Sequence, residues 1–165
     1  MMKKNALIAA AIIAIASTSN VYAQDGALTV SVKRLTLETA RKIAIAAIAE
    51  CRKQGYQVSV TVVDRNGIPQ VMERDTIAPP ISAAVSKDKA YASANFSTPS
   101  GEMSRFKDSP LYHRDGLQMS AGGLLIEAGG YIYGAVGVSG APGGDIDESC
   151  AKAGVDAVIV DLEMQ

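Results

Sequence analysis

The chain has 165 residues and a formal net charge of −1, with nearly equal numbers of basic and acidic side chains. Binding to nucleic acid or to an anionic membrane surface needs a concentrated basic face, which this composition does not offer. Almost half of the residues are hydrophobic while Trp is absent, which favours closely packed backbones over an aromatic binding platform. We therefore expect one small domain that can bury a core of ordinary size.

The first 23 residues have the three parts of a secretory signal peptide. Lys3 and Lys4 give a positive start, an apolar run covers residues 6–16, and Val21-Tyr22-Ala23 supplies small residues at the −3 and −1 positions. The run is shorter than the roughly 20 residues that cross a bilayer, so we expect cleavage and no membrane insertion afterwards. Cleavage would leave 142 residues, 14 basic against 17 acidic, and a charge of −3. The predicted location is periplasmic or secreted.

A leader with some strand character is predicted over residues 24–34, ahead of one domain over residues 35–165. The domain opens with an amphipathic helix, because apolar side chains recur at three and four residues after Thr36. Thr36 can act as the N-cap of this helix, and Gly55 ends it.

A β-hairpin is predicted next. Residues 58–63 alternate in polarity, and residues 68–74 supply the returning strand. Asn66-Gly67 lies between them, and this dipeptide favours a type I′ turn, in which both central residues have positive φ.

The remaining chain predicts two more long helices, one short helix and three strands. A second helix rich in Ala and Ser opens at Ala78-Pro79-Pro80 and runs to about Asn95. The other elements are expected at 102–107 (helix), 116–120, 123–127 and 131–138 (strands), and 145–160 (helix). The order α-β-β-α-α-β-β-β-α, with hairpin connections, predicts an α+β domain with helices packed on a mainly antiparallel five-stranded sheet.

The two cysteines lie on the first and last predicted helices. Cys51 is near the end of one helix and Cys150 near the start of the other, so antiparallel packing of the helices could bring the sulfurs together. A disulfide and two buried free thiols both remain open, because spacing does not determine geometry. A bridge over this loop length would stabilise the fold by roughly 4–5 kcal/mol in the chain-entropy model.

The glycine-rich segment 134–144 precedes the last predicted helix, but its pattern opposes a phosphate site. It has neither the G-x-G-x-x-G spacing nor a Gly-Lys-Ser/Thr ending. Acidic side chains at the start of that helix, among them Asp145 and Asp147, would repel an anion. We expect a tight turn with an acidic cap.

His113 is the only histidine and lies in a polar loop, where a lone histidine is commonly solvated. One histidine and two distant cysteines cannot complete a zinc or copper centre made of protein ligands. Haem needs only one or two axial ligands, so His113 is a candidate for the iron, and Tyr91, other tyrosines and the six methionines widen the choice. No G-x-S-x-G nucleophile motif is present, and the residues alone do not indicate an enzyme.

Several short segments, in this order along the chain, resemble the GlcG/HbpS-like family, also described as the haem-degrading domain family. They are Val62-Val63-Asp64-Arg65-Asn66-Gly67, Arg74-Asp75, Lys89-Ala90-Tyr91-Ala92, Gly122-Gly123-Leu124-Leu125-Ile126, Gly134-Ala135-Val136-Gly137-Val138-Ser139-Gly140, and Asp147-Glu148 followed by Ala151-Lys152-Ala153-Gly154. The resemblance implies an α+β domain that assembles into homo-oligomers. It also implies haem binding, which occurs in some members.

With the export signal, the resemblance leads to the hypothesis of an exported haem-binding protein, a carrier or scavenger that is not catalytic. Haem is then the expected cofactor and His113 the candidate iron ligand. The second hypothesis is an accessory enzyme or binder acting on a small hydroxy acid such as glycolate. Arg74, Asp75, Lys89 and Tyr91 are the candidate ligand-binding residues, with Lys89 as anion anchor or base. The third is an oligomeric structural or sensor subunit, suggested by the Ala/Ser face of residues 82–94.

Overall fold

The computed structural model describes residues 28–165. The predicted signal peptide, over residues 1–23, and the beginning of the predicted leader therefore lie outside the described residues. Within the described part, no helix is both long and apolar enough to cross a membrane. Residues 32–165 form one unit, which contains every helix and strand discussed below.

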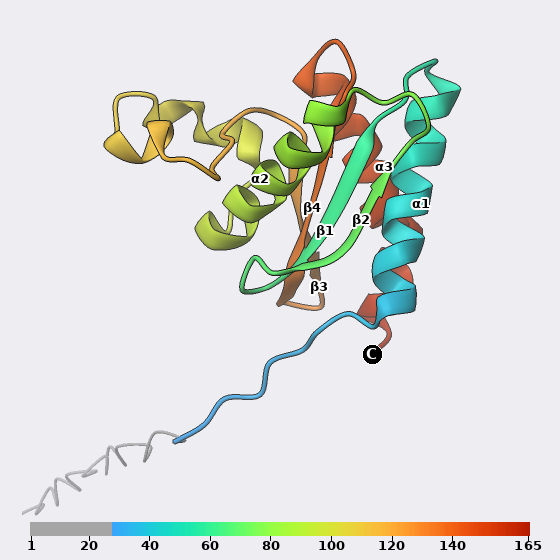
Figure 1. Cartoon of the computed structure of the whole chain (residues 1–165). Helices are drawn as coiled ribbons and strands as arrows, with labels where there is room; N and C mark the ends of the chain where they lie inside the picture. The colour runs from blue at the N-terminus through green and yellow to red at the C-terminus, as the bar shows by residue number, and fades with distance from the viewer. Residues whose placement is uncertain (1–27) are drawn as a thin grey trace, which may run out of the picture. The chain divides into compact units, whose positions relative to one another are not determined.

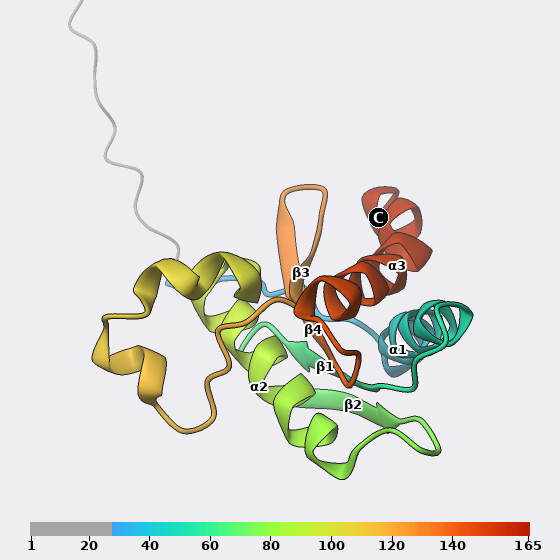
Figure 2. The ribbon, with the colours of Figure 1, turned by 90° about the horizontal axis from the view of Figure 1, so that it is seen from above.

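A four-stranded antiparallel sheet forms the centre of this unit (Figures 1 and 2). Its strands are β1 (Ser59–Asp64), β2 (Pro69–Arg74), β3 (Gly123–Ala128) and β4 (Tyr131–Ser139). Their order across the sheet is β2-β1-β4-β3, and each neighbouring pair is antiparallel. All six residues of β1 are buried, because this strand is central and helices cover both of its faces. The α+β class is confirmed.

The prediction of a fifth strand over residues 116–120 was wrong. Gly116 has a φ of 80°, and the residues after it form turns and irregular backbone. The amide of Gln118 donates to the carbonyl of Asp88 at 3.4 Å, so this segment bonds to a helix rather than to a strand. The order of the other elements agrees with the prediction.

The β1–β2 hairpin is present, but its turn is not of type I′. Gly67 has a φ of 80°, whereas Asn66 does not lie in the positive-φ region. The Asp64 carboxylate accepts hydrogen bonds from the amides of Asn66 (2.8 Å) and Ile68 (3.0 Å). This side-chain cap stabilises a three-residue loop in which only the last residue is left-handed, a known alternative to the two-residue turn.

Helices α1 (Leu37–Lys53) and α3 (Gly144–Glu163) cover one face of the sheet, and α2 (Pro80–Phe96) covers the other (Figure 2). The main core lies between the sheet and the α1–α3 pair. The Thr36 hydroxyl accepts from the Thr39 amide at 3.2 Å and caps α1, as its sequence predicts.

The small-residue face of α2, over residues 82–94, packs against the sheet. The Ser59 and Ser82 hydroxyl oxygens lie 2.7 Å apart. The Thr61 and Ser86 hydroxyl oxygens lie 2.8 Å apart. The polar side chains of β1 thus have hydrogen-bond partners on α2. The small-residue face of α2 is covered by the sheet of the same chain.

Two glycines allow the helices to approach their neighbours closely. A Cβ on Gly137 of β4 would overlap the backbone of α2 at the carbonyl of Ser86. A Cβ on Gly154 of α3 would lie 2.7 Å from the carbonyl oxygen of Ile43 in α1. Any side chain at either position would push the layers apart.

Of the two alternatives left open for the cysteines, the disulfide is present: Cys51 and Cys150 are bonded, and both side chains are fully buried. The bridge joins the end of α1 to the start of α3, the two helices that share the main core. It closes a sequence separation of 99 residues, which is long enough to restrict the unfolded chain strongly.

Residues 97–122, which we call the arm, leave the end of α2 and return to β3 (Figure 1). The arm contains two 3-10 helices, η1 (Ser100–Phe106) and η2 (Pro110–His113). It shares a small core with α2, formed by Ala92 and Phe96 of the helix and by Met103, Phe106, Tyr112, Leu117 and Met119 of the arm. The Ser100 hydroxyl donates to the Ser120 carbonyl at 2.6 Å and so holds the two ends of the arm together.

Candidate functional site

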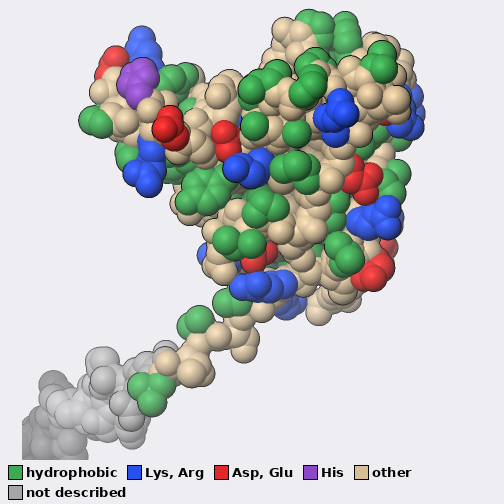
Figure 3. Space-filling view, in the orientation of Figure 1, with side chains coloured by type: hydrophobic (Ala, Val, Ile, Leu, Met, Phe, Trp, Pro, Cys, Tyr) green, Lys and Arg blue, Asp and Glu red, His purple; other side chains and the backbone are tan. Residues whose placement is uncertain are grey.

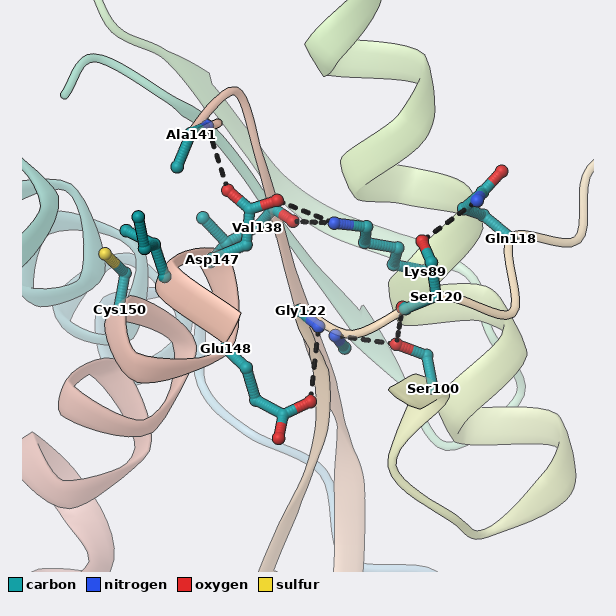
Figure 4. Close-up of polar contacts among 12 residues, drawn as sticks. Lys89, Ser100, Gln118, Ser120, Gly122, Val138, Ala141, Asp147, Glu148 and Cys150 are labelled. Atoms are coloured by element: carbon teal, nitrogen blue, oxygen red, sulfur yellow. Dashed lines mark hydrogen bonds and ion pairs between the residues drawn. The ribbon is translucent and has the colours of Figure 1, made fainter. Parts of the chain in front are cut away.

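A buried ion pair joins α2 to α3 beside the end of β4 (Figure 4). Lys89 Nζ lies 2.7 Å from Asp147 Oδ2 and also donates to the carbonyl of Val138 at 3.0 Å. The other carboxylate oxygen of Asp147 accepts from the Ala141 amide at 3.1 Å. Each charged side chain is only 4% exposed. The pair therefore links the sheet with a helix from each of its faces.

The protonation of Asp147 depends on two opposing effects. Burial raises the pKa of Asp147 because it penalises the charged form, while the hydrogen bond and charge of Lys89 act to lower it. A ligand could use Lys89 only by separating it from Asp147, which would leave a buried carboxylate without its cation. The observed contacts thus give Lys89 a structural partner inside the protein.

Arg74 and Asp75 lie at the end of β2, as predicted, and both side chains bond within the chain. Asp75 binds the guanidinium of Arg52, on α1, through two hydrogen bonds of 2.6 and 2.7 Å. These bonds hold the pKa of Asp75 below its usual value despite its burial. Arg74 donates to the Ala78 carbonyl at 2.6 Å, which closes the turn before α2. This strand end fastens α1 and the start of α2 to the sheet.

Tyr91 lies on the outer side of α2, next to the arm. It lines a hollow of about 210 Å³ together with Asp88 of its own helix and with Arg114 and Asp115 of the arm. The Tyr91 ring also lies over Gly67, where a Cβ would come within 2.6 Å of it.

His113 ends η2 and is exposed, next to Tyr112, whose ring centroid is 5.7 Å away. Figure 3 shows the histidine at the tip of the arm. Among residues 28–165, no three His, Cys, Asp or Glu side chains gather into a metal-binding group. Iron ligation by His113 would thus need an iron that brings other ligands, as the iron in haem does.

The sequence reasoning missed a larger hollow on the outer surface of α1 and α3, which we call the α1–α3 hollow. Its volume is about 640 Å³. It is lined by Leu37, Glu38, Arg41, Lys42, Ile45, Ala46 and Ala157. The signal in the sequence was the four-residue spacing of Leu37, Arg41 and Ile45, which forms a second stripe on α1, outside the core-facing one.

The candidate residues do not meet in one place. Asp75 is engaged with α1, and Lys89 with α3. Tyr91 lines the small hollow beside the arm, and His113 lies at the arm's tip. The roles predicted for these residues in ligand binding remain predictions.

Comparison with known families agrees with the resemblance noted in the sequence. The family model for haem-degrading, HbpS-like proteins matches residues 35–156. This range includes the whole sheet, α1, α2 and the first part of α3, which continues to Glu163. The chain belongs to the HbpS-like family.

Solved structures give the same result. HbpS has 40% sequence identity to this chain, a TM-score of 0.74, and coverage of 84% of this chain and 99% of HbpS. A double mutant of Streptomyces reticuli HbpS matches at 39% identity and the same TM-score, over 86% of this chain and 98% of that one. Protein ORFY of Klebsiella pneumoniae is 25% identical, with a TM-score of 0.74, over 79% of this chain and 94% of its own.

A more distant structure, the PduOC–haem complex, is 22% identical with a TM-score of 0.69, over 76% of this chain and 95% of that chain. At this identity the likeness shows a shared fold. Comparison with curated proteins gave no significant match.

Proposed function

We propose that this chain is an exported haem-binding protein that carries or sequesters haem and does not turn it over. The observation that carries the proposal is family membership, because the matching family is described as haem-degrading and covers nearly the whole described domain. The description supports a relation to haem, whereas the carrier role without turnover is our own proposal. The PduOC structure, which has the same fold, was solved as a haem complex. Both findings favour haem over the small hydroxy acids of the second hypothesis.

The disulfide supports export. Structural disulfides persist in oxidising compartments and are rare in the bacterial cytosol. Cys51 and Cys150 are bonded across the α1–α3 pair, and this agrees with the signal peptide predicted over residues 1–23. A protein outside the cytoplasm would meet haem before it enters the cell. We propose in addition that the chain forms a homo-oligomer, as the family resemblance implies.

His113 is the proposed iron ligand. Its imidazole is exposed and has no hydrogen-bond partner in the described structure, so no residue among 28–165 competes with iron for it. Lys89 and Asp75, by contrast, are both held in ion pairs. When bound, haem would supply an iron centre that already carries the four porphyrin nitrogens, so that a single protein side chain such as His113 could hold it.

A haemin titration of the purified protein tests the proposal. We expect a saturable, shifted Soret band in the wild-type protein and in Lys107→Ala, a control variant on the same arm. His113→Ala should change the ligand-field bands. A wild-type spectrum that only follows free haemin would overturn the proposed function. An unchanged His113→Ala spectrum would overturn the ligand assignment alone.

Two further measurements separate this proposal from its competitors. Specific binding of glycolate or glyoxylate would raise the melting temperature by mass action, and a rise with these acids but not with haemin would favour the second hypothesis.

The haem complex incubated with ascorbate should keep its Soret band as long as a haem complex of serum albumin does. Faster bleaching would show turnover and contradict the carrier role.

A further inference from the structure

We propose that two copies of this chain pair through the outer edge of β3, so that their two four-stranded sheets become one continuous sheet. The inference rests on the homo-oligomer included in the proposed function, and it names the surface and the partner. It does not depend on haem.

β3 is one of the two edge strands of the sheet. The strand order ends at β3, and Figure 2 shows the β3–β4 hairpin at the outer margin of the sheet. Among the described residues, only those of β4 bond to the backbone of residues 124–128. An open edge presents unpaired amide and carbonyl groups, and these form a template for a further strand.

The two edges of the sheet differ in their protection against such pairing. β2, the other edge strand, begins with Pro69 and carries Glu73 and Arg74. Proline and charged side chains are the usual protection of an exposed edge. β3 has the sequence Gly-Leu-Leu-Ile-Glu-Ala, with a single charge and no proline. We therefore expect β3 to be the edge that the assembled protein covers.

One hydrogen bond gives the direction of the backbone groups of β3. The amide of Gly123 donates to Ser100 Oγ, in the arm, at 2.8 Å, so it points out of the sheet. Outward and inward residues alternate along an antiparallel edge strand, and the amide and carbonyl of Leu125 therefore point outward as well. Leu125 is thus the residue that can exchange two hydrogen bonds with a second strand.

Two β3 strands satisfy each other when they run antiparallel about a two-fold axis at Leu125. The Leu125 amide of each copy then donates to the Leu125 carbonyl of the other copy. Both copies use the same edge, so the contact is reciprocal. The axis is perpendicular to the sheet, and α3 therefore lies on the same side of the joined sheet in both copies.

This arrangement also brings the two α3 helices together. α3 packs over both β3 and β4, so the helix lies about half a strand spacing inside the edge. Neighbouring strands are about 4.8 Å apart, which would place the two helix axes roughly 10 Å apart. Packed helices lie at about this distance.

The facing surfaces of the two helices have complementary charges. A hollow of about 480 Å³ beside the β3 edge is lined by Leu124 and by four residues of α3, which are Asp145, Glu148, Ser149 and Lys152. The two-fold axis reverses the second helix, so Lys152 of each copy lies toward the acidic turn around Glu148 of the other. Lys152 now pairs with Asp156, but both side chains are more than half exposed, and such a pair is exchanged at small cost.

Proline substitution tests the contact without removing a bond within the chain. Leu125→Pro removes an amide hydrogen that points outward, and edge strands tolerate proline at such positions. Met72→Pro, on β2, is the matched control. The Asp75 amide donates to the Val58 carbonyl at 3.0 Å, so the same alternation turns the amide of Met72 outward. Circular dichroism and urea unfolding compare both variants with the wild type.

Cross-linking tests the location directly. The chain has two cysteines, which are bonded to each other, so an introduced cysteine is the only free thiol. Leu125→Cys would lie beside its own copy across the axis, and a short bismaleimide should join the two chains. Met72→Cys, on the opposite edge of the sheet, should remain uncross-linked under the same conditions.

Light scattering should give Met72→Pro the wild-type oligomer mass and Leu125→Pro at most half of it, because the contact joins copies in pairs. An unchanged mass for a folded Leu125→Pro would overturn the β3 contact. Equal cross-linking at positions 72 and 125 would also overturn it, and this result decides the matter where Leu125→Pro does not fold. These outcomes leave the proposed oligomer and haem binding standing. A monomeric wild type would overturn both the contact and the oligomer, and the haemin titration would still test haem binding separately.

Discussion

The sharpest structural prediction concerns Lys89→Met, which removes one charge from the buried ion pair while keeping most of the apolar volume of the side chain. Asp147 would then keep only the Ala141 amide as a partner. Breaking a buried pair on one side costs about 3–5 kcal/mol, because the remaining charge stays desolvated. Domains of this size are stable by only about 5–15 kcal/mol, so the variant should unfold at a much lower urea concentration.

The pH dependence of the loss identifies its cause. Burial already raises the pKa of Asp147, and removal of Lys89 removes the main effect that lowers it. The native variant should therefore bind a proton at a pH where the unfolded chain does not. Its stability deficit grows as pH rises through this interval and shrinks as pH falls and Asp147 becomes neutral.

Urea unfolding of oxidised protein at a series of pH values, upward from about pH 4, near the ordinary Asp pKa, measures both effects. The double variant Lys89→Met/Asp147→Asn is the control, because it has no buried charge to leave unpaired and Asn can still accept from the Ala141 amide. We expect it to regain most of the loss. A deficit below about 1 kcal/mol, or one that does not change with pH, would mean that water reaches Asp147 and would refute this reasoning.

Three further predictions concern the fold. Replacing Cys51 and Cys150 by Ser should cost about 4–5 kcal/mol in thermal unfolding, and a reductant should then destabilise the wild type but not the variant. Asp75→Asn should lower stability at neutral pH, and its difference from wild type should vanish in acid, because the lowered pKa of Asp75 contributes stability only while the carboxylate is charged. Gly137→Ala should cost about 1–3 kcal/mol by forcing α2 from the sheet; an unchanged urea midpoint would contradict the close approach.

The sequence predicted local structure better than it predicted detail in turns. The amphipathic pattern after Thr36 and the alternation before Asn66 identified a helix and a hairpin, because each depends on the spacing of side chains along a short segment. The type of turn depended on the Asp64 carboxylate, which caps two amides. The preference of type I′ turns for Asn-Gly does not take that cap into account.

The missing strand has a different cause. Residues 116–120 have a length and composition that a strand could adopt, but Gln118 bonds to the backbone of α2. Whether such a segment pairs with a strand or with a helix is decided by tertiary contacts and not by its own pattern. Because residues 116–120 bond to α2 and not to a strand, the sheet has four strands and not five.

The candidate site was the least predictable part, since its contacts join residues distant in the chain. Lys89 and Asp147 are 58 positions apart, and they belong to two different segments among those that resemble the family. A single sequence gives no sign that they form one pair. The α1–α3 hollow was hidden for the same reason, because Ala157 comes to Arg41 only through the packing of two helices.

Four residues from the segments that resemble the family make contacts that hold the fold together. Lys89 and Asp147 bind each other, Gly137 admits α2 to the sheet, and Gly154 admits α3 to α1. These four residues thus hold the three helices on the sheet. Exposed side chains such as His113 have no such role in the described structure, and they are free to bind a ligand. Substitutions at these four residues should therefore change stability first, whereas His113→Ala should change haem binding with stability unaffected.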